Sequence, residues 1–421
     1  MEKDFLLDNW QKTGNDIEDF KDIIKQIAEQ TNFVKINSKE LTVLSYHGKT
    51  EDGKLEFVEF NPIRVHNDNG AIAPHQFLRI APRAILSKGD FENLINEVTN
   101  DVGLLFYNGI KCMFVSKKVL TTKLLPFGIN GDFLSEKSYA RDLLIAKLFG
   151  SKALFRTLVT REENGITKVF SILGERYKSL SQDILVTIYE ALTKGDLMGS
   201  PACNHWEITH FMSNIRIEFP DKADEFQTLY GLPDKLVPGI ILETSDTGDC
   251  SIRVKGFWRV KNSISLHSEV SKKHIGRLDI DNLLEEVNNS IFSEYTMFPE
   301  ALCDLMSKNV SDPSWDLSTA SGRSKNNKKI ETILKHAFKH LKVVEAIGKQ
   351  AEMALYEQLL YEFDDSIAYT AYDFAVAIMS LPERVIGLHP LTQEKLAKAV
   401  SKAPYIKYEA KDETSAIILT A

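Results

Sequence analysis

The sequence predicts an α+β fold, with antiparallel sheets backed by helices and a helical C-terminal unit. Two stretches, 32–66 and 153–262, contain short β-like runs separated by turn residues. After residue 270 the apolar residues recur almost wholly at helical spacing. A chain of 421 residues that is 43% apolar can bury more than one core, so we expect two or three packed units.

The first 150 residues are expected to form an N-terminal α+β region. Apolar residues at three- and four-residue spacing predict an amphipathic helix over 15–31, and the runs between 32 and 66 predict a small antiparallel meander. The remaining elements of this region are expected to be helices near 75–86 and 89–102, a strand over 109–116 and a helix over 135–150.

Residues 151–270 are expected to form a β-rich core. The alternation of Phe155, Thr157 and Val159, with Glu162–Gly165 at the turn, predicts a hairpin over 153–173. A helix over 181–192 should follow it. Three more strand-like runs are expected over 208–220, 237–248 and 250–262, because Gly, Pro and Asp separate them.

The rest of the chain is expected to be helical, with one interruption. A helical connection over 271–310 should lead into the stretch 311–329, SDPSWDLSTASGRSKNNKK. This stretch has few apolar residues and many Ser, Asn, Lys and Asp residues, which predicts a flexible linker. Residues 330–421 should then form a helical C-terminal unit.

Charge and composition narrow the range of functions. The net charge of −8 argues against a protein that coats duplex DNA through its overall field, so any nucleic-acid site must be a local patch. The N-terminus has no secretory pattern and no segment has about 18 uninterrupted apolar residues, so we expect a cytoplasmic protein that does not bind membranes. The four cysteines are widely spaced, which predicts neither disulfides nor a cysteine zinc site.

Two stretches resemble a known family. ILGERYKSLSQDILVTIYEAL at 172–192 and VPGIILETSDTGDCSIRVKGFWRVKNSISL at 237–266 are similar, in order and spacing, to motifs of the phage- and plasmid-borne family catalogued as domain of unknown function 932. The chain departs from the family pattern at Thr244-Ser245 and at Val260–Ser263. The resemblance implies a gene carried on a mobile element, and it brings no catalytic residues or cofactor with it.

The strand SIRVKGFWRVK is the first candidate for binding nucleic acid. Because side chains alternate along a strand, the basic residues and Phe257 should lie on the face opposite the apolar Val254 and Trp258. Cations around an aromatic ring are the combination that single-strand binders use to follow phosphates and stack a base, although exposed strands also carry Lys and Arg for solubility. The candidate residues on this face are Arg253, Lys255, Phe257, Arg259 and Lys261.

A second candidate is a local excess of positive charge at the edge of the predicted linker. From Arg323 to Glu345 there are seven basic and two acidic residues, in a chain with a net negative charge. Such an excess can contact phosphates, and it is also common on solvated helix faces. The candidate residues nearest the linker are Arg323, Lys325, Lys328 and Lys329.

Metal and catalytic motifs are weak. His336 and His340 are four residues apart on an expected helix, but the Glu that would follow the first His in a zincin motif is replaced by Ala337. The spacing of Cys203, His205 and His210 matches no established metal site. Asp279 and Asp281, with Glu285 and Glu286, could be the metal-binding carboxylates of a nuclease, but helix capping and solvation are the favoured explanation. The sequence has no phosphate-binding P-loop and no G-x-S-x-G elbow. We therefore expect no metal site and no cofactor, and the catalytic residues of any enzyme are unknown.

Taken together, these patterns favour a phage or plasmid accessory protein that binds nucleic acid. Single-stranded DNA in replication or recombination is the expected partner, as for a single-strand annealing protein that forms a homo-oligomer; this analogy is at the level of the fold. Two alternatives stay open. One is a factor that binds a host or phage protein, as in anti-defence or host takeover, and the other is a metal-dependent nuclease.

Overall fold

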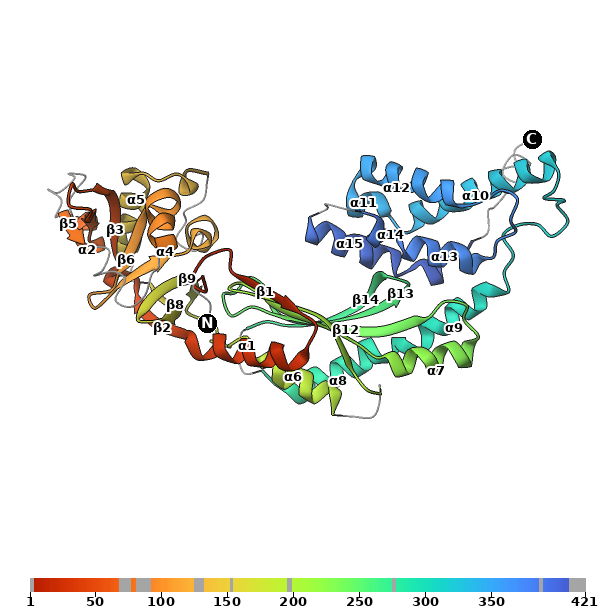
Figure 1. Ribbon diagram of the computed structural model, residues 1–421, viewed down its shortest axis with the longest axis horizontal. Coiled ribbons are helices and arrows are strands. Elements are labelled where there is room, and N and C mark those ends of the chain that lie inside the picture. The colour runs from red at the N-terminus through yellow and green to blue at the C-terminus, as the bar shows by residue number, and fades with distance from the viewer. Residues whose placement is uncertain are drawn as a thin grey trace, which may run out of the picture.

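The computed structural model describes residues 4–67, 77–80, 92–124, 132–151, 154–194, 199–274, 278–385 and 389–408. The molecule is elongated, with a lobe built on one sheet, a second sheet in the middle and a layer of C-terminal helices (Figure 1). The predicted α+β class and the helical C-terminal part are confirmed.

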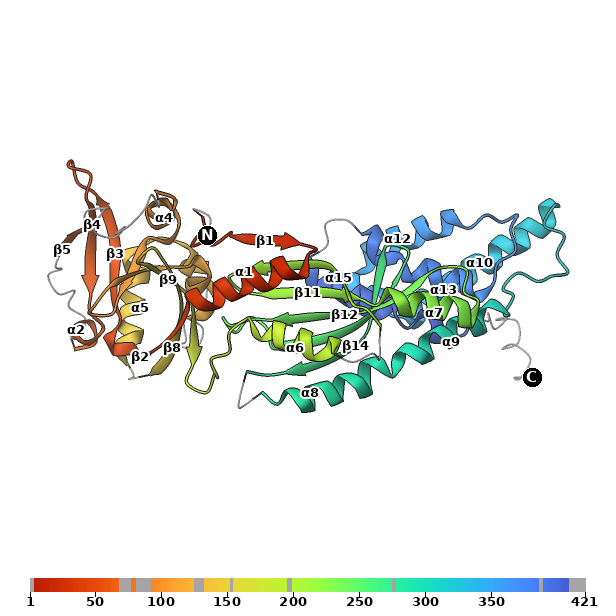
Figure 2. The same cartoon turned by 60° about the horizontal axis from the view of Figure 1, so that its bottom comes forward.

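The central sheet has six antiparallel strands in the order β1-β10-β11-β12-β13-β14. Five helices cover one face of it, and they come forward in Figure 2. Phe20 of α1 packs on Trp206 of β10, and Phe298 of α9 stacks on Trp258 of β13, so one apolar core runs beneath the sheet. The strands are β1 (Gln11–Gly14), β10 (Ala202–Thr209), β11 (Ser213–Glu218), β12 (Leu236–Thr244), β13 (Ile252–Val260) and β14 (Ser263–Lys272). The helices are α1 (Ile17–Gln30), α6 (Ile184–Thr193), α7 (Pro220–Tyr230), α8 (Ile280–Val287) and α9 (Glu294–Met306).

The second sheet has eight strands in the order β2-β8-β9-β7-β6-β3-β4-β5, and its β7–β9 pair is parallel. The strands are β2 (Thr31–Asn37), β3 (Thr42–Lys49), β4 (Leu55–Phe60), β5 (Phe77–Ile80), β6 (Leu104–Tyr107), β7 (Cys112–Val115), β8 (Phe155–Glu163) and β9 (Ile166–Gly174). Helices α2 (Pro62–Asn67), α4 (Glu92–Asn96) and α5 (Tyr139–Ser151) belong to the same lobe, and a π-helical segment, Glu97–Val102, follows α4.

The two sheets do not divide the chain at residue 150 as expected. Strands β8 and β9 complete the N-terminal sheet, whereas β1 joins the central one. The expected helix near 75–86 is also wrong where the structure describes it, because Phe77–Ile80 pairs with β4 as a strand; residues 81–86 lie outside the described residues.

Local turn chemistry explains the hairpins. The predicted hairpin over 153–173 is confirmed as β8–β9, and its two-residue turn is Asn164-Gly165. Both turn residues have positive φ, at 52° and 80°, which is the conformation that Asn-Gly adopts with little strain. The single strand expected over 208–220 is instead the end of β10, a turn and β11. The strand predicted over 250–262 is confirmed as β13.

The C-terminal helices pack along the β13–β14 side of the central sheet, and α10 and α12 lie farthest from it (Figure 1). Ser263 of β14 donates a hydrogen bond to the carbonyl of Met379 in α13, and Ala397 of α15 packs on Leu266. The helices of this unit are α10 (Ala320–His340), α11 (Val343–Ile347), α12 (Lys349–Glu362), α13 (Ala371–Met379), α14 (Leu381–Arg384) and α15 (Pro390–Val400).

The predicted flexible linker over 311–329 is wrong for its second half, because residues 320–329 form the first half of α10. The Thr319 hydroxyl caps the helix by accepting a hydrogen bond from the Gly322 N–H at 3.0 Å. Asn326 is fully buried; its amide donates to the carbonyls of Asp365 and Ile367 at 2.9 and 2.8 Å. Polar contacts, rather than apolar ones, hold this part of the helix, so hydrophobic periodicity did not reveal it.

A buried ion pair joins the two sheets. Arg161 of β8 donates two hydrogen bonds, of 2.7 and 3.0 Å, to the carboxylate of Asp246, which follows β12. Neither side chain is exposed. Gln182 also donates to Asp246, at 3.0 Å, so the carboxylate is well satisfied in its buried setting.

Replacing Asp246 by Ala should lower the free energy of unfolding by about 3–5 kcal/mol, because the Arg161 guanidinium would stay buried without its counterion. Urea unfolding followed by circular dichroism measures this. The control is Glu225→Ala, which removes an exposed carboxylate paired with Lys222 and should cost no more than about 1 kcal/mol. Equal costs for the two variants would show that the sheets are joined without this pair.

Replacing Gly322 by Ala should destabilise the protein by about 1–3 kcal/mol, although Ala usually favours a helix by about 1 kcal/mol over Gly. The added Cβ would lie 2.0 Å from the carbonyl oxygen of Asp316, which is backbone and cannot turn aside. Thermal melting of Gly322→Ala is compared with melting of Ser324→Ala, an exposed position in the same helix. A gain in stability from both substitutions would contradict the tight approach at Gly322.

Candidate nucleic-acid interface

The alternation predicted for β13 is confirmed on its apolar side. Ile252, Val254, Trp258 and Val260 all lie in the core beneath the sheet. The Trp258 ring stacks on Phe298 with ring centroids 4.9 Å apart. The opposite face therefore carries the charged residues, as expected.

The expectation that this opposite face is exposed is wrong. Phe257 is fully buried between Leu266 of β14 and Ala397 of α15, so its ring cannot stack a nucleic-acid base. The register of β13 against β14 shifts between Gly256 and Phe257. The C-terminal unit thus covers the part of the strand that was expected to bind nucleic acid.

Three of the four cations on this face are engaged with carboxylates. Lys255 is 2% exposed, and its ammonium lies 3.0 Å from Glu243 of β12 and 2.8 Å from Glu394 of α15. Arg259 donates two hydrogen bonds of 2.7 Å to Glu218 of β11, and Arg253 lies 3.2 Å from Glu243 of β12. The carboxylates of β11 and β12 that neutralise this face come next to it only in the folded sheet.

Lys261 is the exception on this strand. It lies in the turn after β13 with a positive φ of 55°, its side chain is 63% exposed, and its ammonium is 4.0 Å from Asp234. A single exposed lysine does not make a phosphate track, so β13 is better described as the docking surface for α15.

The second predicted region does form a basic surface. The exposed lysines Lys325, Lys328, Lys335 and Lys339 recur at three-, four- and seven-residue spacing along α10, so they share one face of the helix, and the half-buried Lys329 lies beside them. The helix has six Lys and Arg residues and one acidic residue, Glu331. We call this set of five lysines the α10 basic face.

The charges of the α10 basic face are mostly unneutralised. Lys335 lies 3.5 Å from Glu331, and across the part of the chain that the structure describes the ammonium groups of the other four lysines make no hydrogen bond or ion pair. Near the start of the helix, hydrogen bonds from Ser314 and the charges of Lys325 and Lys329 lower the pKa of Asp312. One exposed carboxylate therefore offsets part of the charge at that end.

Arg323 does not belong to the α10 basic face. It is half-buried and lies on another side of the helix. Hydrogen bonds from Ser366 and, more weakly, the charge of Arg323 lower the pKa of Asp364. The charge of Arg323 is thus near Asp364 and apart from the lysines.

The residues considered for a metal lie apart or have other roles. Asp279 caps α8 by accepting a hydrogen bond from the Asn282 N–H at 3.0 Å, and Glu286 pairs with Lys272. His336 and His340 are exposed on α10 with ring centroids 6.0 Å apart. Among the described residues, no group of three or more His, Cys, Asp or Glu side chains converges to hold a metal ion.

The cysteine and histidine cluster is also dispersed. His210 is fully buried and stacks on Phe170 with ring centroids 3.9 Å apart. Burial, together with the charges of Arg161 and Lys168, holds the pKa of His210 well below its ordinary value, so it stays neutral. Cys203 and His205 are on β10, and both are half-buried.

Sequence reasoning did not anticipate that the two family-like stretches meet. The hydroxyl of Tyr177 donates to the carbonyl of Ser245 at 3.1 Å and lies 2.7 Å from Nδ1 of His274. Gln182 of the first stretch also reaches Asp246 of the second. These contacts are buried or half-buried and hold the junction between the sheets, which gives both stretches a structural role.

No family model, no curated protein and no solved structure matches this chain. Among the helices that the structure describes, none is long and apolar enough to cross a membrane.

The contact of α15 with β13 should weaken in acid. Burial raises the pKa of Glu394, but hydrogen bonds and charges from Lys255 and Lys398 outweigh it and lower the pKa from 4.5 to about 2. Because the folded pKa is depressed, the stabilisation, at most about 3 kcal/mol, is complete above pH 4.5 and is lost as the pH falls toward 2. Unfolding free energies measured across this range should therefore fall less for Glu394→Gln than for the wild type. Parallel pH profiles for the two proteins would contradict the assignment.

Proposed function

We propose that this protein binds nucleic acid through the α10 basic face, by contacts to the phosphate backbone. The observation that carries the proposal is a row of lysines, four of them without an ion pair within the described residues, along one side of a 21-residue helix in a chain with net charge −8. A local patch of this kind is what an acidic protein needs in order to attract a polyanion.

The chemistry of the face indicates how it would recognise its partner. An α-helix of this length extends about 30 Å, and lysines on successive turns can each neutralise a phosphate. Phe338 of α10 is buried, so the face offers no Phe, Tyr or Trp ring for base stacking. Lysine contacts to phosphate carry no sequence information. Binding should therefore be independent of sequence, without the preference for single strands that an exposed Phe257 would have supplied.

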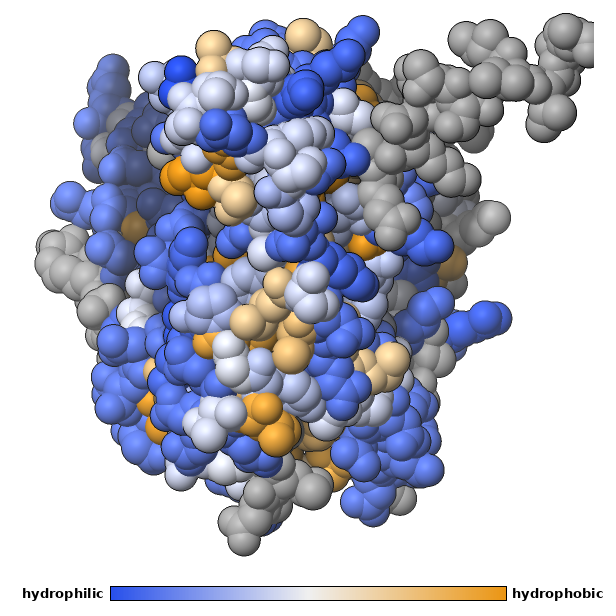
Figure 3. Space-filling view, turned by 90° about the vertical axis from the view of Figure 1, so that its right-hand side faces the viewer, coloured by the Kyte–Doolittle hydropathy of each residue, from blue (hydrophilic) through white to orange (hydrophobic). Residues whose placement is uncertain are grey.

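The surroundings of α10 agree with a polar partner. Figure 3 looks at the end of the molecule where α10 begins, and hydrophilic residues dominate this surface while its apolar areas are small and separate. Large continuous apolar patches mark protein-docking surfaces, and none is visible on this side. The resemblance to a phage and plasmid family suggests replication or recombination as the setting for such binding.

The proposal predicts that Lys328→Glu with Lys339→Glu weakens binding to every oligonucleotide tested. Loss of two phosphate contacts should reduce the slope of log affinity against log salt by about 1.8 for duplex or about 1.4 for single strands. Fluorescence anisotropy with labelled single- and double-stranded oligonucleotides at several salt concentrations measures both quantities.

The matched control is Lys25→Glu with Lys402→Glu, which makes the same change in net charge at exposed positions of other elements. It should bind nearly as well as the wild type. Equal losses in the two double variants would mean that overall charge, and not the α10 basic face, governs binding. Absence of binding by the wild type at low salt would refute the proposed function.

A further inference from the structure

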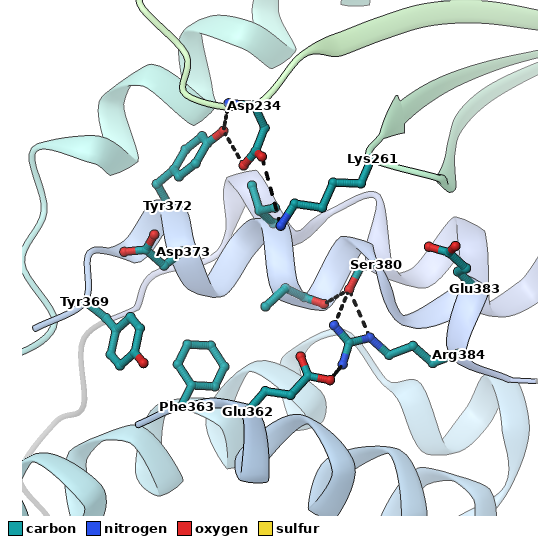
Figure 4. A pocket seen from close by; sticks show the side chains of 12 residues that line it. Asp234, Lys261, Glu362, Phe363, Tyr369, Tyr372, Asp373, Ser380, Glu383 and Arg384 are labelled. Atoms are coloured by element: carbon teal, nitrogen blue, oxygen red, sulfur yellow. Dashed lines mark hydrogen bonds and ion pairs between the residues drawn. The ribbon is translucent and has the colours of Figure 1, made fainter. Parts of the chain in front are cut away.

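A pocket of about 300 Å³ lies where the end of the central sheet meets the C-terminal unit (Figure 4). Asp234, before β12, and Lys261, after β13, contribute its sheet side. Its other walls come from the end of α12, the loop that follows it, α13 and α14. This volume is at the lower limit for small-molecule sites and suits a small ligand or one side chain of a larger one.

Both cations in the pocket already have carboxylate partners. Arg384 forms an ion pair with Glu362 and donates to the hydroxyl of Ser380 at 2.7 Å. Lys261 faces Asp234 at 4.0 Å. Each positive charge is therefore offset by a nearby carboxylate.

Two further carboxylates line the pocket and give it an excess of negative charge. Glu383 is exposed and makes no hydrogen bond or ion pair with any described residue. Asp373 accepts hydrogen bonds from Thr370 through one oxygen, Oδ2, and has no cationic partner in the described chain. In Figure 4 the two side chains lie on opposite sides of the group of labelled residues. A ligand between them would have to be positively charged.

Aromatic rings complete the walls of the pocket. Phe363 and Tyr369 pack edge to face with centroids 4.9 Å apart, and Tyr372 bonds through its hydroxyl to Asp234. Ring faces attract ammonium and guanidinium groups. A metal ion is not the expected ligand, because among the described residues no three His, Cys, Asp or Glu side chains come together. The excess of carboxylates repels phosphate, so this pocket is not an extension of the α10 basic face.

We infer that this pocket binds an organic cation carrying an alkylammonium or guanidinium group. The ligand would extend along α13, with one charged group near Asp373 and the aromatic rings and another near Glu383. The group can come from a free amine or from a Lys or Arg side chain of a peptide, because both present the same chemistry. The inference does not depend on nucleic-acid binding and goes beyond it.

The experiment is isothermal titration of the full chain, at low ionic strength, with spermidine, with agmatine and with a short peptide of Lys, Arg and Gly. Saturable binding of the free amines identifies a small-molecule site, and saturable binding of the peptide alone identifies a peptide side chain as the source; either supports the inference. Sodium sulfate serves as the anionic control and should give no heat of binding at this site.

Variants with opposite expected effects locate the site. Glu383→Gln removes an unpaired carboxylate and should weaken binding by about three- to fivefold. Arg384→Gln releases Glu362 from its ion pair and should strengthen binding by a similar factor. The control Glu285→Gln makes the same charge change as Glu383→Gln on the exposed side of α8 and should leave affinity unchanged. Melting curves show that each variant is folded.

Two results would overturn the inference. The first is the lack of saturable binding of any of the three cations by the folded wild type. The second is an equal effect of Glu383→Gln and Glu285→Gln, since this would show attraction to the net charge of the protein rather than to the pocket. Because neither result involves an oligonucleotide, both can be told apart from a failure of the proposed nucleic-acid function.

Discussion

The buried ion pair between Arg161 and Asp246 is the interaction on which the arrangement of the two sheets depends. It joins β8 of one sheet to the end of β12 of the other, and both side chains are inaccessible to solvent. Buried charges need hydrogen-bond partners, and Gln182 and the carbonyl of His210 supply two of them. The pair thereby joins strands that are far apart in sequence.

A second set of ion pairs joins the C-terminal unit to the central sheet. Lys255 on β13 binds Glu243 beside it and Glu394 on α15, and Phe257 fills the adjacent space under Ala397. The cations and the ring that suggest a nucleic-acid surface in the sequence are therefore the interface between a sheet and a helix. A strand face that mixes cations with an aromatic ring serves either purpose, and the acidic residues on neighbouring elements decide between them.

The two sides of α10 have different roles: one side makes buried polar contacts, and the other carries the α10 basic face. Gly322 and Asn326 occupy the buried side of the first half of the helix, where backbone approaches closely and two carbonyls need a donor. The lysines are left on the outer side with little acidic compensation. The same helix borders the loop that forms one wall of the acidic pocket, through the contacts of Asn326 with Asp365 and Ile367. Surfaces of opposite charge thus lie on one small helical unit.

The α+β class, the β8–β9 hairpin with its Asn-Gly turn and the two faces of β13 follow from the sequence alone, because spacing and turn chemistry are local properties. The sequence does not show how far the cations between Arg253 and Lys261 are exposed to solvent. Their exposure depends on Glu218, Glu243 and Glu394, which only folding brings to this strand. Likewise, residues 320–329 look like a linker because their helix is held by one buried amide rather than by apolar periodicity. Long-range pairing, which no local pattern records, decided which basic residues reach solvent.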